Sequence, residues 1–139
     1  MAKTIDMQFM RYINLFEKIS RVSTTNCFIY NNTIFFAVPK LLVSQAIGPG
    51  ASNVKRMSET LRKKIKVIIM PNDEKGMKKF VEEIVDPIQI NTLELKDGVV
   101  FISADRQAKA MLIGRNRVRE QELIDILSKT FKIRDLKIG

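Results

Sequence analysis

Residues 47–55 read Ile-Gly-Pro-Gly-Ala-Ser-Asn-Val-Lys, and an altered form of this stretch recurs at residues 113–117 as Ile-Gly-Arg-Asn-Arg. In both places a run that can form a helix stops at a glycine, and a second, charged helix can begin shortly afterwards. Glycine at a helix end readily takes the left-handed backbone conformation that other residues resist. A helix that begins at such a turn points unpaired N–H groups into the gap, and these groups favour an anion. The two stretches therefore predict two turns that can accept phosphates.

The basic residues of the chain gather around these two turns. The 139 residues include 24 Lys and Arg against 15 Asp and Glu, a formal net charge of +9. Residues 40–66 hold seven basic residues against one acid, Glu59, and residues 103–139 hold nine against five, whereas residues 67–102 carry more acids than bases. Most Lys and Arg side chains simply face solvent. A clustered excess of this size is nevertheless typical of proteins that bind nucleic acid.

The composition excludes several kinds of catalytic and metal site. With no histidine and a single cysteine, Cys27, the chain cannot form a zinc finger, a Ser-His-Asp triad or an internal disulfide. We interpret Cys27 as a small buried hydrophobe, and we expect no enzyme, no metal and no cofactor. No apolar run approaches the roughly 18 residues of a membrane span, and the amino terminus lacks the apolar stretch of a secretory signal. We therefore expect a cytoplasmic protein with no membrane partner.

The first half of the chain is predicted to fold as helix, two strands, two helices and a strand. Apolar residues at helical spacing predict the helices, and runs of aromatic and β-branched residues predict the strands. Asn31-Asn32 is a two-residue hairpin signal between two of these strands. We interpret Ser52 as the N-cap of the basic helix. The predicted elements are a helix over 4–21, strands over 27–30 and 33–38, a short helix over 39–47, a basic helix over 52–64 and a strand over 65–70.

The same order of elements follows a short linker at residues 71–74. Asp97-Gly98 is a strong hairpin signal, and a change in the alternation of apolar residues between Ile90 and Leu93 predicts a bulge or a bend. The predicted elements are a helix over 77–85, strands over 88–95 and 99–102, helices over 105–112 and 117–129, and a final strand over 131–138.

A shift of 66 residues aligns the two halves of the chain. It carries Asn31-Asn32 onto Asp97-Gly98, Ile47-Gly48 onto Ile113-Gly114, and the closing strand of the first half onto a strand that begins at Phe131. Helical periodicity alone would not bring the turns along, so the chain is predicted to be a duplication. We expect an α+β fold with domains over 1–70 and 75–139. Each domain is near the lower size limit for a stable core, so we expect the two to pack as one rigid body.

The pattern resembles the type II KH domain, whose signature is an Ile/Val-Ile-Gly-x-x-Gly-x-x-Ile/Val-Lys segment. Residues 46–55 match this segment except at the fourth loop position, where Ala51 replaces glycine. Two such units with almost no linker are similar to the archaeal NusA-like transcription termination/antitermination factors, which are tandem KH pairs. The resemblance implies two tandem type II KH domains, each α-β-β-α-α-β. It also implies that each loop holds the backbone of about four nucleotides of single-stranded RNA.

The resemblance places the RNA contacts at the two glycine turns, but the two copies differ. In the first turn Pro49 removes one N–H donor, and Ala51 has to avoid positive φ or bear strain. In the second copy Arg117 stands at the last glycine position, and Glu120 stands where an apolar residue is expected and opposes an incoming phosphate. We therefore expect the first turn to bind RNA and the second to be altered in role. The candidate RNA-binding residues are Gly48, Pro49, Gly50, Ala51, Ser52, Lys55, Arg56, Gly114, Arg115, Asn116, Arg117 and Arg119.

Three classes of function remain open from the sequence. The first is a monomeric RNA-binding transcription factor that contacts single-stranded nascent RNA, with RNA polymerase as a protein partner, and modulates termination or antitermination. The second is a protein-interaction module with degenerate loops that docks on RNA polymerase or the ribosome. The third is a duplex-DNA binder that uses the helix over 52–64 for recognition. RNA retention that weakens as the salt concentration rises would favour the first class. Capture of polymerase or ribosome that survives nuclease treatment would favour the second class, and preference for duplex DNA over single strands would favour the third.

Overall fold

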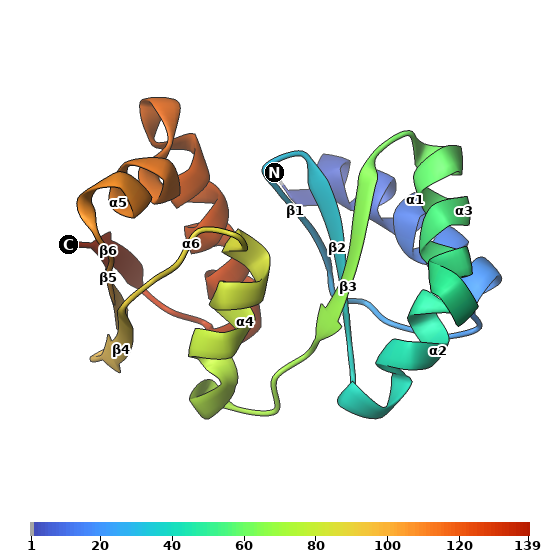
Figure 1. The fold of residues 1–139 in the computed structure, drawn as a ribbon, viewed down its shortest axis with the longest axis horizontal. Coiled ribbons are helices and arrows are strands. Elements are labelled where there is room, and N and C mark those ends of the chain that lie inside the picture. The colour runs from blue at the N-terminus through green and yellow to red at the C-terminus, as the bar shows by residue number, and fades with distance from the viewer. Residues whose placement is uncertain (1) are drawn as a thin grey trace. The chain divides into compact units, whose positions relative to one another are not determined.

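The chain divides into two compact units, Met1–Met70 and Pro71–Gly139, in the computed structural model, which describes residues 2–139 and side chains from Met7 onward. Each unit follows the order helix, strand, strand, helix, helix, strand. Within the described residues this gives six α-helices and two three-stranded sheets (Figure 1). The predicted α+β class and the order of elements are confirmed.

The first unit is built on β2 (Thr33–Val38), the middle strand of its sheet. β1 (Cys27–Tyr30) pairs with β2 antiparallel, and β3 (Lys64–Ile69) pairs with it parallel. The helices are α1 (Ala2–Ser20), α2 (Val43–Ile47) and α3 (Ser52–Leu61), with a short 3₁₀ turn at Lys40–Leu42 before α2. All three helices lie on one face of the sheet in Figure 1, where this unit runs from blue to green.

Every residue of β2 after Thr33 is buried, and alternate residues along the strand pack against the helices. Ile34, Phe36 and Val38 pack with Phe16 of α1 and Met57 of α3 in one buried cluster. The rings of Phe16 and Phe36 stack with their centroids 4.3 Å apart. Each large buried side chain stabilises the fold by about 1.5–3 kcal/mol. This cluster holds α3 against the sheet and so fixes the position of the turn between α2 and α3.

The second unit repeats this plan around β5 (Val99–Ser103). β4 (Thr92–Lys96) pairs with β5 antiparallel, and β6 (Asp135–Ile138) pairs with it parallel. The helices of this unit are α4 (Met77–Val85), α5 (Arg106–Ile113) and α6 (Val118–Phe131). Its buried side chains include Val100, Ile102, Leu112, Leu123 and Leu127.

Both predicted hairpin turns are confirmed. Asn31 and Asn32 have φ of 49° and 62°, and Asp97 and Gly98 have φ of 55° and 78°. Positive φ at both central residues is the geometry of a type I′ turn, which matches the twist of the flanking strands. The asparagines and the Asp-Gly pair tolerate this geometry, and that is why the sequence signal was reliable.

The end of the second unit departs from the 66-residue offset. α6 runs one turn longer than α3 and ends at Phe131, with Lys132 in a left-handed cap. The ring of Phe131 packs edge-on against that of Phe80, with centroids 5.9 Å apart, and this contact accompanies the extra helical turn. The predicted strand over 131–138 is therefore wrong in its first half, because β6 begins only at Asp135.

The first strand of the second unit also differs from its prediction. β4 begins at Thr92 rather than at residue 88, and it pairs with β5 residue by residue through Lys96, without a bulge. The N–H of Ile88 donates instead to the carbonyl of Val85, at the end of α4. The change of alternation before Leu93 thus marks a bend at Asn91, where the chain enters the strand. Of the two predicted alternatives, the bulge is wrong and the bend is confirmed.

Candidate nucleic-acid interface

The first glycine turn joins α2 to α3 through one 3₁₀ turn, Pro49–Ala51. Gly48 has φ 80° and ψ 162°, a combination essentially confined to glycine. A Cβ added at Gly48 would lie 2.8 Å from the Ser52 hydroxyl oxygen and 2.9 Å from the amide carbon of Asn53. Gly48 is therefore required for the close approach of the turn to the start of α3.

The left-handed backbone of this turn extends through Ala51. Gly50 and Ala51 both have φ of 61°, so Ala51 does not avoid positive φ and bears a strain of about 1–2 kcal/mol. Ala51 occupies the N-cap position of α3, and Ser52 is already helical with φ −61°. The predicted Ser52 cap is wrong because the 3₁₀ turn leads directly into the helix and the N–H of Ser52 donates to the carbonyl of Pro49.

Part of the hydrogen-bonding capacity of the turn is used internally. The N–H of Ala51 donates to the carbonyl of Gly48 at 3.0 Å, beside the Ser52 bond to Pro49. Pro49 itself has no N–H to offer. Attraction of an anion to this turn therefore depends more on nearby cationic side chains than on a row of free backbone donors.

Those cations are present and available at the first turn. Pro49 and Gly50 are exposed at the tip of the turn, and Lys55 and Arg56 are exposed on the first turns of α3. Neither Lys55 nor Arg56 forms an ion pair with any side chain in the described part of the chain. Among the side chains from Met7 onward, the two charges thus face solvent without a counter-ion, beside a turn that is open to an outside strand.

Asn53 is a structural member of the site that the sequence analysis missed. Its Nδ2 donates to the carbonyl oxygen of Gln45 at 3.1 Å and so ties α3 to α2 across the turn. Its side chain also lies against Gly48. An asparagine early in a helix carries no specific signal for such a bridge, because the partner is a backbone carbonyl of another helix.

The second glycine turn has the same backbone as the first at an offset of 66 residues. Gly114 has φ 75° and ψ 172°, Asn116 has φ 55°, and Arg117 has φ 62°, closely matching the first turn. A Cβ added at Gly114 would lie 2.7 Å from Cγ of Arg119. The predicted duplication of the glycine turn is thus confirmed, with different side chains on the same backbone.

The arginines of the second turn are held by acids of their own helix. Arg117 Nε donates to Glu120 Oε1 at 2.6 Å, and Arg119 Nη1 donates to Glu122 Oε1 at 2.5 Å. The hydrogen bond to Glu120, with the charge of that carboxylate, raises the pKa of the Arg117 guanidinium. Only 7% of the Glu120 side chain is exposed, against 76% of that of Arg117. The sequence signal for these pairs was their i, i+3 spacing on a helix.

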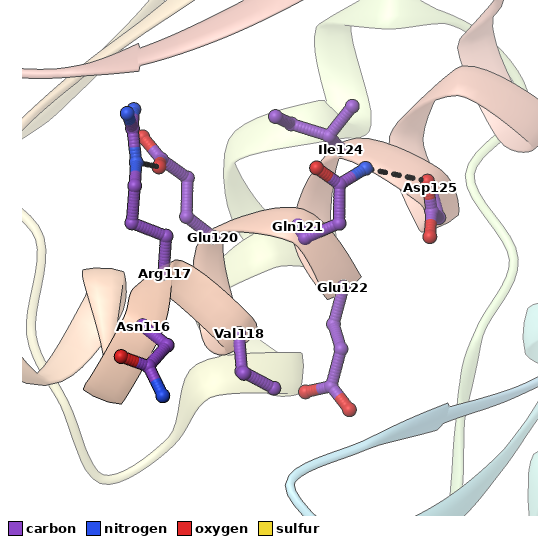
Figure 2. Close-up of a pocket in the computed structure, with 8 residues that line it drawn as sticks. All are labelled: Asn116, Arg117, Val118, Glu120, Gln121, Glu122, Ile124 and Asp125. Atoms are coloured by element: carbon purple, nitrogen blue, oxygen red, sulfur yellow. Dashed lines mark hydrogen bonds and ion pairs between the residues drawn. The ribbon is translucent and has the colours of Figure 1, made fainter.

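A hollow of about 670 Å³ lies beside the start of α6 (Figure 2). Arg117 and Glu120 point together to one side of the helix start, while Val118 and Glu122 point to the other. Acids outnumber bases in its lining, so the hollow itself is poorly suited to phosphate. The lining residues are Asn116, Arg117, Val118, Glu120, Gln121, Glu122, Ile124 and Asp125.

The structure gathers the candidate residues into two groups, one in each unit. The group from Gly48 to Arg56 surrounds the first turn, and the group from Gly114 to Arg119 surrounds the second. Arg115 and Asn116 are exposed at the second tip. Among the side chains described from Met7 onward, no His, Cys, Asp and Glu side chains group as metal ligands, and no described helix is long and apolar enough to cross a bilayer.

Comparison with known proteins finds relatives that share one name. No protein-family model matches the chain. Three curated proteins, each called probable transcription termination protein NusA, are similar to it. The protein from Methanocaldococcus jannaschii is 30% identical over 130 residues, covering 91% of this chain and 69% of that protein. The protein from Methanococcus vannielii is 26% identical and covers 91% and 73%, and that from Halococcus morrhuae is 23% identical over the full length of both chains.

One solved structure is similar to this chain over nearly the whole length of both. The crystal structure of APE1850 matches with a TM-score of 0.65 at 26% identity, covering 94% of this chain and 96% of that chain. The M. jannaschii relative is matched over more than two thirds of its own length. The chain belongs to the NusA family.

Proposed function

We propose that the chain binds single-stranded RNA through its first glycine turn and acts in transcription termination or antitermination. The observation that carries the RNA proposal is the exposed Pro49-Gly50 tip beside Lys55 and Arg56, two cations with no counter-ion among the described side chains. The shared name of the relatives, a transcription termination protein, supports the second part. RNA polymerase is the protein partner that this role requires.

The two units are proposed to be tandem type II KH domains. The order of elements in each unit and the repetition of the glycine-turn backbone, from φ 80° at Gly48 to φ 75° at Gly114, support this assignment. Such domains clamp about four backbone nucleotides at the loop between two helices. In this chain Gly48 and Gly50 let the strand approach, and Lys55 and Arg56 contact its phosphates.

The second turn contributes less to RNA binding in this proposal. Arg115 and Asn116 remain at its exposed tip as phosphate contacts, while Arg117 and Arg119 are held by carboxylates. Each phosphate contact to a single strand contributes a slope of about −0.7 to the dependence of log K on log salt concentration. The first turn is therefore expected to supply most of that slope.

Titration of a labelled single-stranded RNA into loop variants tests the proposal. The first-turn variant carries Pro49→Asp with Gly50→Asp, and the second-turn variant carries Arg115→Asp with Asn116→Asp. Lys78→Asp, at an exposed position of α4, is a control with the same charge change as the first-turn variant. We expect the first-turn variant to lose most affinity at about 50 mM salt, the second-turn variant less, and the control least.

The outcome that contradicts the proposal is equal retention of RNA by all these proteins. A preference of the wild type for duplex DNA over single strands would also contradict it, in favour of recognition by α3. Circular dichroism spectra of the variants show whether a loss of binding reflects unfolding.

A second candidate function, docking on RNA polymerase or the ribosome without RNA, is favoured by one observation. The side chains of Met111 and Val118, on either side of the second turn, are 47% and 44% exposed. Their counterparts at the first turn, Gln45 and Ser52, are polar. Capture of purified polymerase that survives nuclease treatment and is lost in Met111→Ser with Val118→Ser would support this function.

A further inference from the structure

The two glycine turns share a backbone but differ in how their cations are neutralised. At the first turn Lys55 and Arg56 have no ion-pair partner among the described residues. At the second turn Arg117 and Arg119 each contact a carboxylate within 2.6 Å. A guanidinium already paired with a carboxylate offers less net charge to a phosphate and has to exchange one anion for another.

The position of Glu120 in the fold stabilises its ion pair with Arg117. It occupies the helix position that Val54 has in the first unit, and only 7% of its side chain is exposed. A carboxylate in such a position needs a hydrogen-bonded partner, and Arg117 Nε supplies it at 2.6 Å. Glu120 also lies in the first turn of α6, where the helix dipole favours a negative charge. The Glu120 carboxylate therefore neutralises the Arg117 guanidinium, as the phosphate of a bound nucleic acid otherwise would.

Glu122 repeats the arrangement one step along the helix. Its Oε1 accepts from Arg119 Nη1 at 2.5 Å, and both side chains are about one quarter exposed. The stem of Arg119 lies against Gly114, so its direction is set by the turn itself. Two of the three arginines of the second turn are thereby neutralised, and only Arg115 lacks a described carboxylate partner.

We infer that Glu120 and Glu122 are built-in counter-ions that weaken the second turn for nucleic-acid phosphates and so make the first turn the preferred site. This inference rests on the proposed RNA-binding function and names the residues that set the inequality of its two sites. Removing either acid takes a carboxylate away from a guanidinium on a backbone that already has the geometry of the first turn. The second turn then gains a phosphate contact.

The test is titration of a labelled single-stranded RNA into full-length Glu120→Gln and Glu122→Gln proteins at about 50 and 200 mM salt. Asp125→Asn is the matched control, since it removes one charge from the same helix but its carboxylate accepts from the neutral amide of Gln121. We expect roughly three- to tenfold tighter binding for each glutamate variant at the lower salt, with a salt slope steeper by about 0.7. The control is expected to change far less.

A second variant keeps the test decisive. Combining Glu120→Gln with Arg117→Ala is expected to return the affinity to that of Arg117→Ala alone, because the gain requires the freed guanidinium. Wild-type binding with equal small gains in Glu120→Gln, Glu122→Gln and Asp125→Asn would overturn the inference and leave the proposed function standing. Binding only by the glutamate variants would show that the two acids suppress the second turn, but it would overturn both the proposed function and the preference for the first turn. No binding by any protein would also overturn both.

Discussion

Replacing Gly48 with alanine is expected to destabilise the first unit by about 2–4 kcal/mol. The backbone at Gly48, with φ 80° and ψ 162°, costs a side-chain-bearing residue about 1–3 kcal/mol. The new Cβ would also lie 2.8–2.9 Å from side-chain atoms of Ser52 and Asn53. Asn53 can move away only by giving up its bond to the Gln45 carbonyl, which contributes about 0.5–1.5 kcal/mol.

Gly50→Ala is the matched control in the same turn. Gly50 has φ 61° and ψ 26°, and a Cβ there would meet nothing within 4 Å. Its replacement therefore carries only the left-handed penalty of about 1–2 kcal/mol. The equivalent position of the second turn holds Asn116 at φ 55°, which shows that this backbone accepts a side chain.

Urea unfolding followed by circular dichroism measures both effects. With a slope of about 1–3 kcal/mol per molar urea, the midpoint for Gly48→Ala is expected to fall by about 1 M or more, and that for Gly50→Ala by clearly less. Equal midpoints for the two variants, or a loss below about 0.5 kcal/mol for Gly48→Ala, would refute the close-approach argument, since that size is typical of a neutral surface change.

Three further results are expected from local geometry. Ala51→Gly should raise the free energy of unfolding by about 0.5–1 kcal/mol in urea melts, because relief of left-handed strain exceeds the entropic cost of glycine; unchanged stability would speak against that strain. Asp105→Ala should lower it by about 0.5–2 kcal/mol, since the Asp105 carboxylate accepts from the N–H of Ala108 at 2.8 Å as the N-cap of α5. The exposed Asp125→Asn is the comparison, and equal losses would contradict the cap. Burial raises the pKa of the Cys27 thiol from 9.0 to about 12. The unfolded chain therefore loses this proton above pH 9 while the folded chain keeps it. The contribution of the protonated thiol to the free energy of unfolding is complete below pH 9. It should fall by up to about 1.4 kcal/mol per pH unit as the pH rises toward 12. Cys27→Ala should lack this slope in melts at matched pH, and an identical slope would count against the burial of the thiol.

The turns and the order of elements were predictable because short-range chemistry decides them. Asn31-Asn32 and Asp97-Gly98 accept positive φ without help from distant residues, and the run of aromatic and β-branched residues over 33–38 forms the buried strand β2 as predicted. These signals reside in neighbouring residues and need no knowledge of the partner element.

The errors arose where the outcome depends on a contact or a side-chain geometry that the spacing of residues in the sequence does not fix. The extra turn of α6 accompanies a ring contact between Phe131 and Phe80, which no local pattern reveals. The N-cap moved from Ser52 to Ala51 because the 3₁₀ turn feeds directly into α3. The candidate cations were identifiable by type, but whether each had a counter-ion depended on the side-chain geometry of Glu120 and Glu122.

The most direct test of RNA binding at the first turn is to follow backbone amide signals by NMR while single-stranded RNA is added to the full-length protein. The account expects the amide signals of Gly50 and of Ser52 to Arg56 to shift most, and those of Arg115 to Arg119 to shift less at the same RNA concentration. Unchanged signals at residues 48–56, with RNA-dependent shifts elsewhere or nowhere, would contradict the assignment of the first turn as the RNA site.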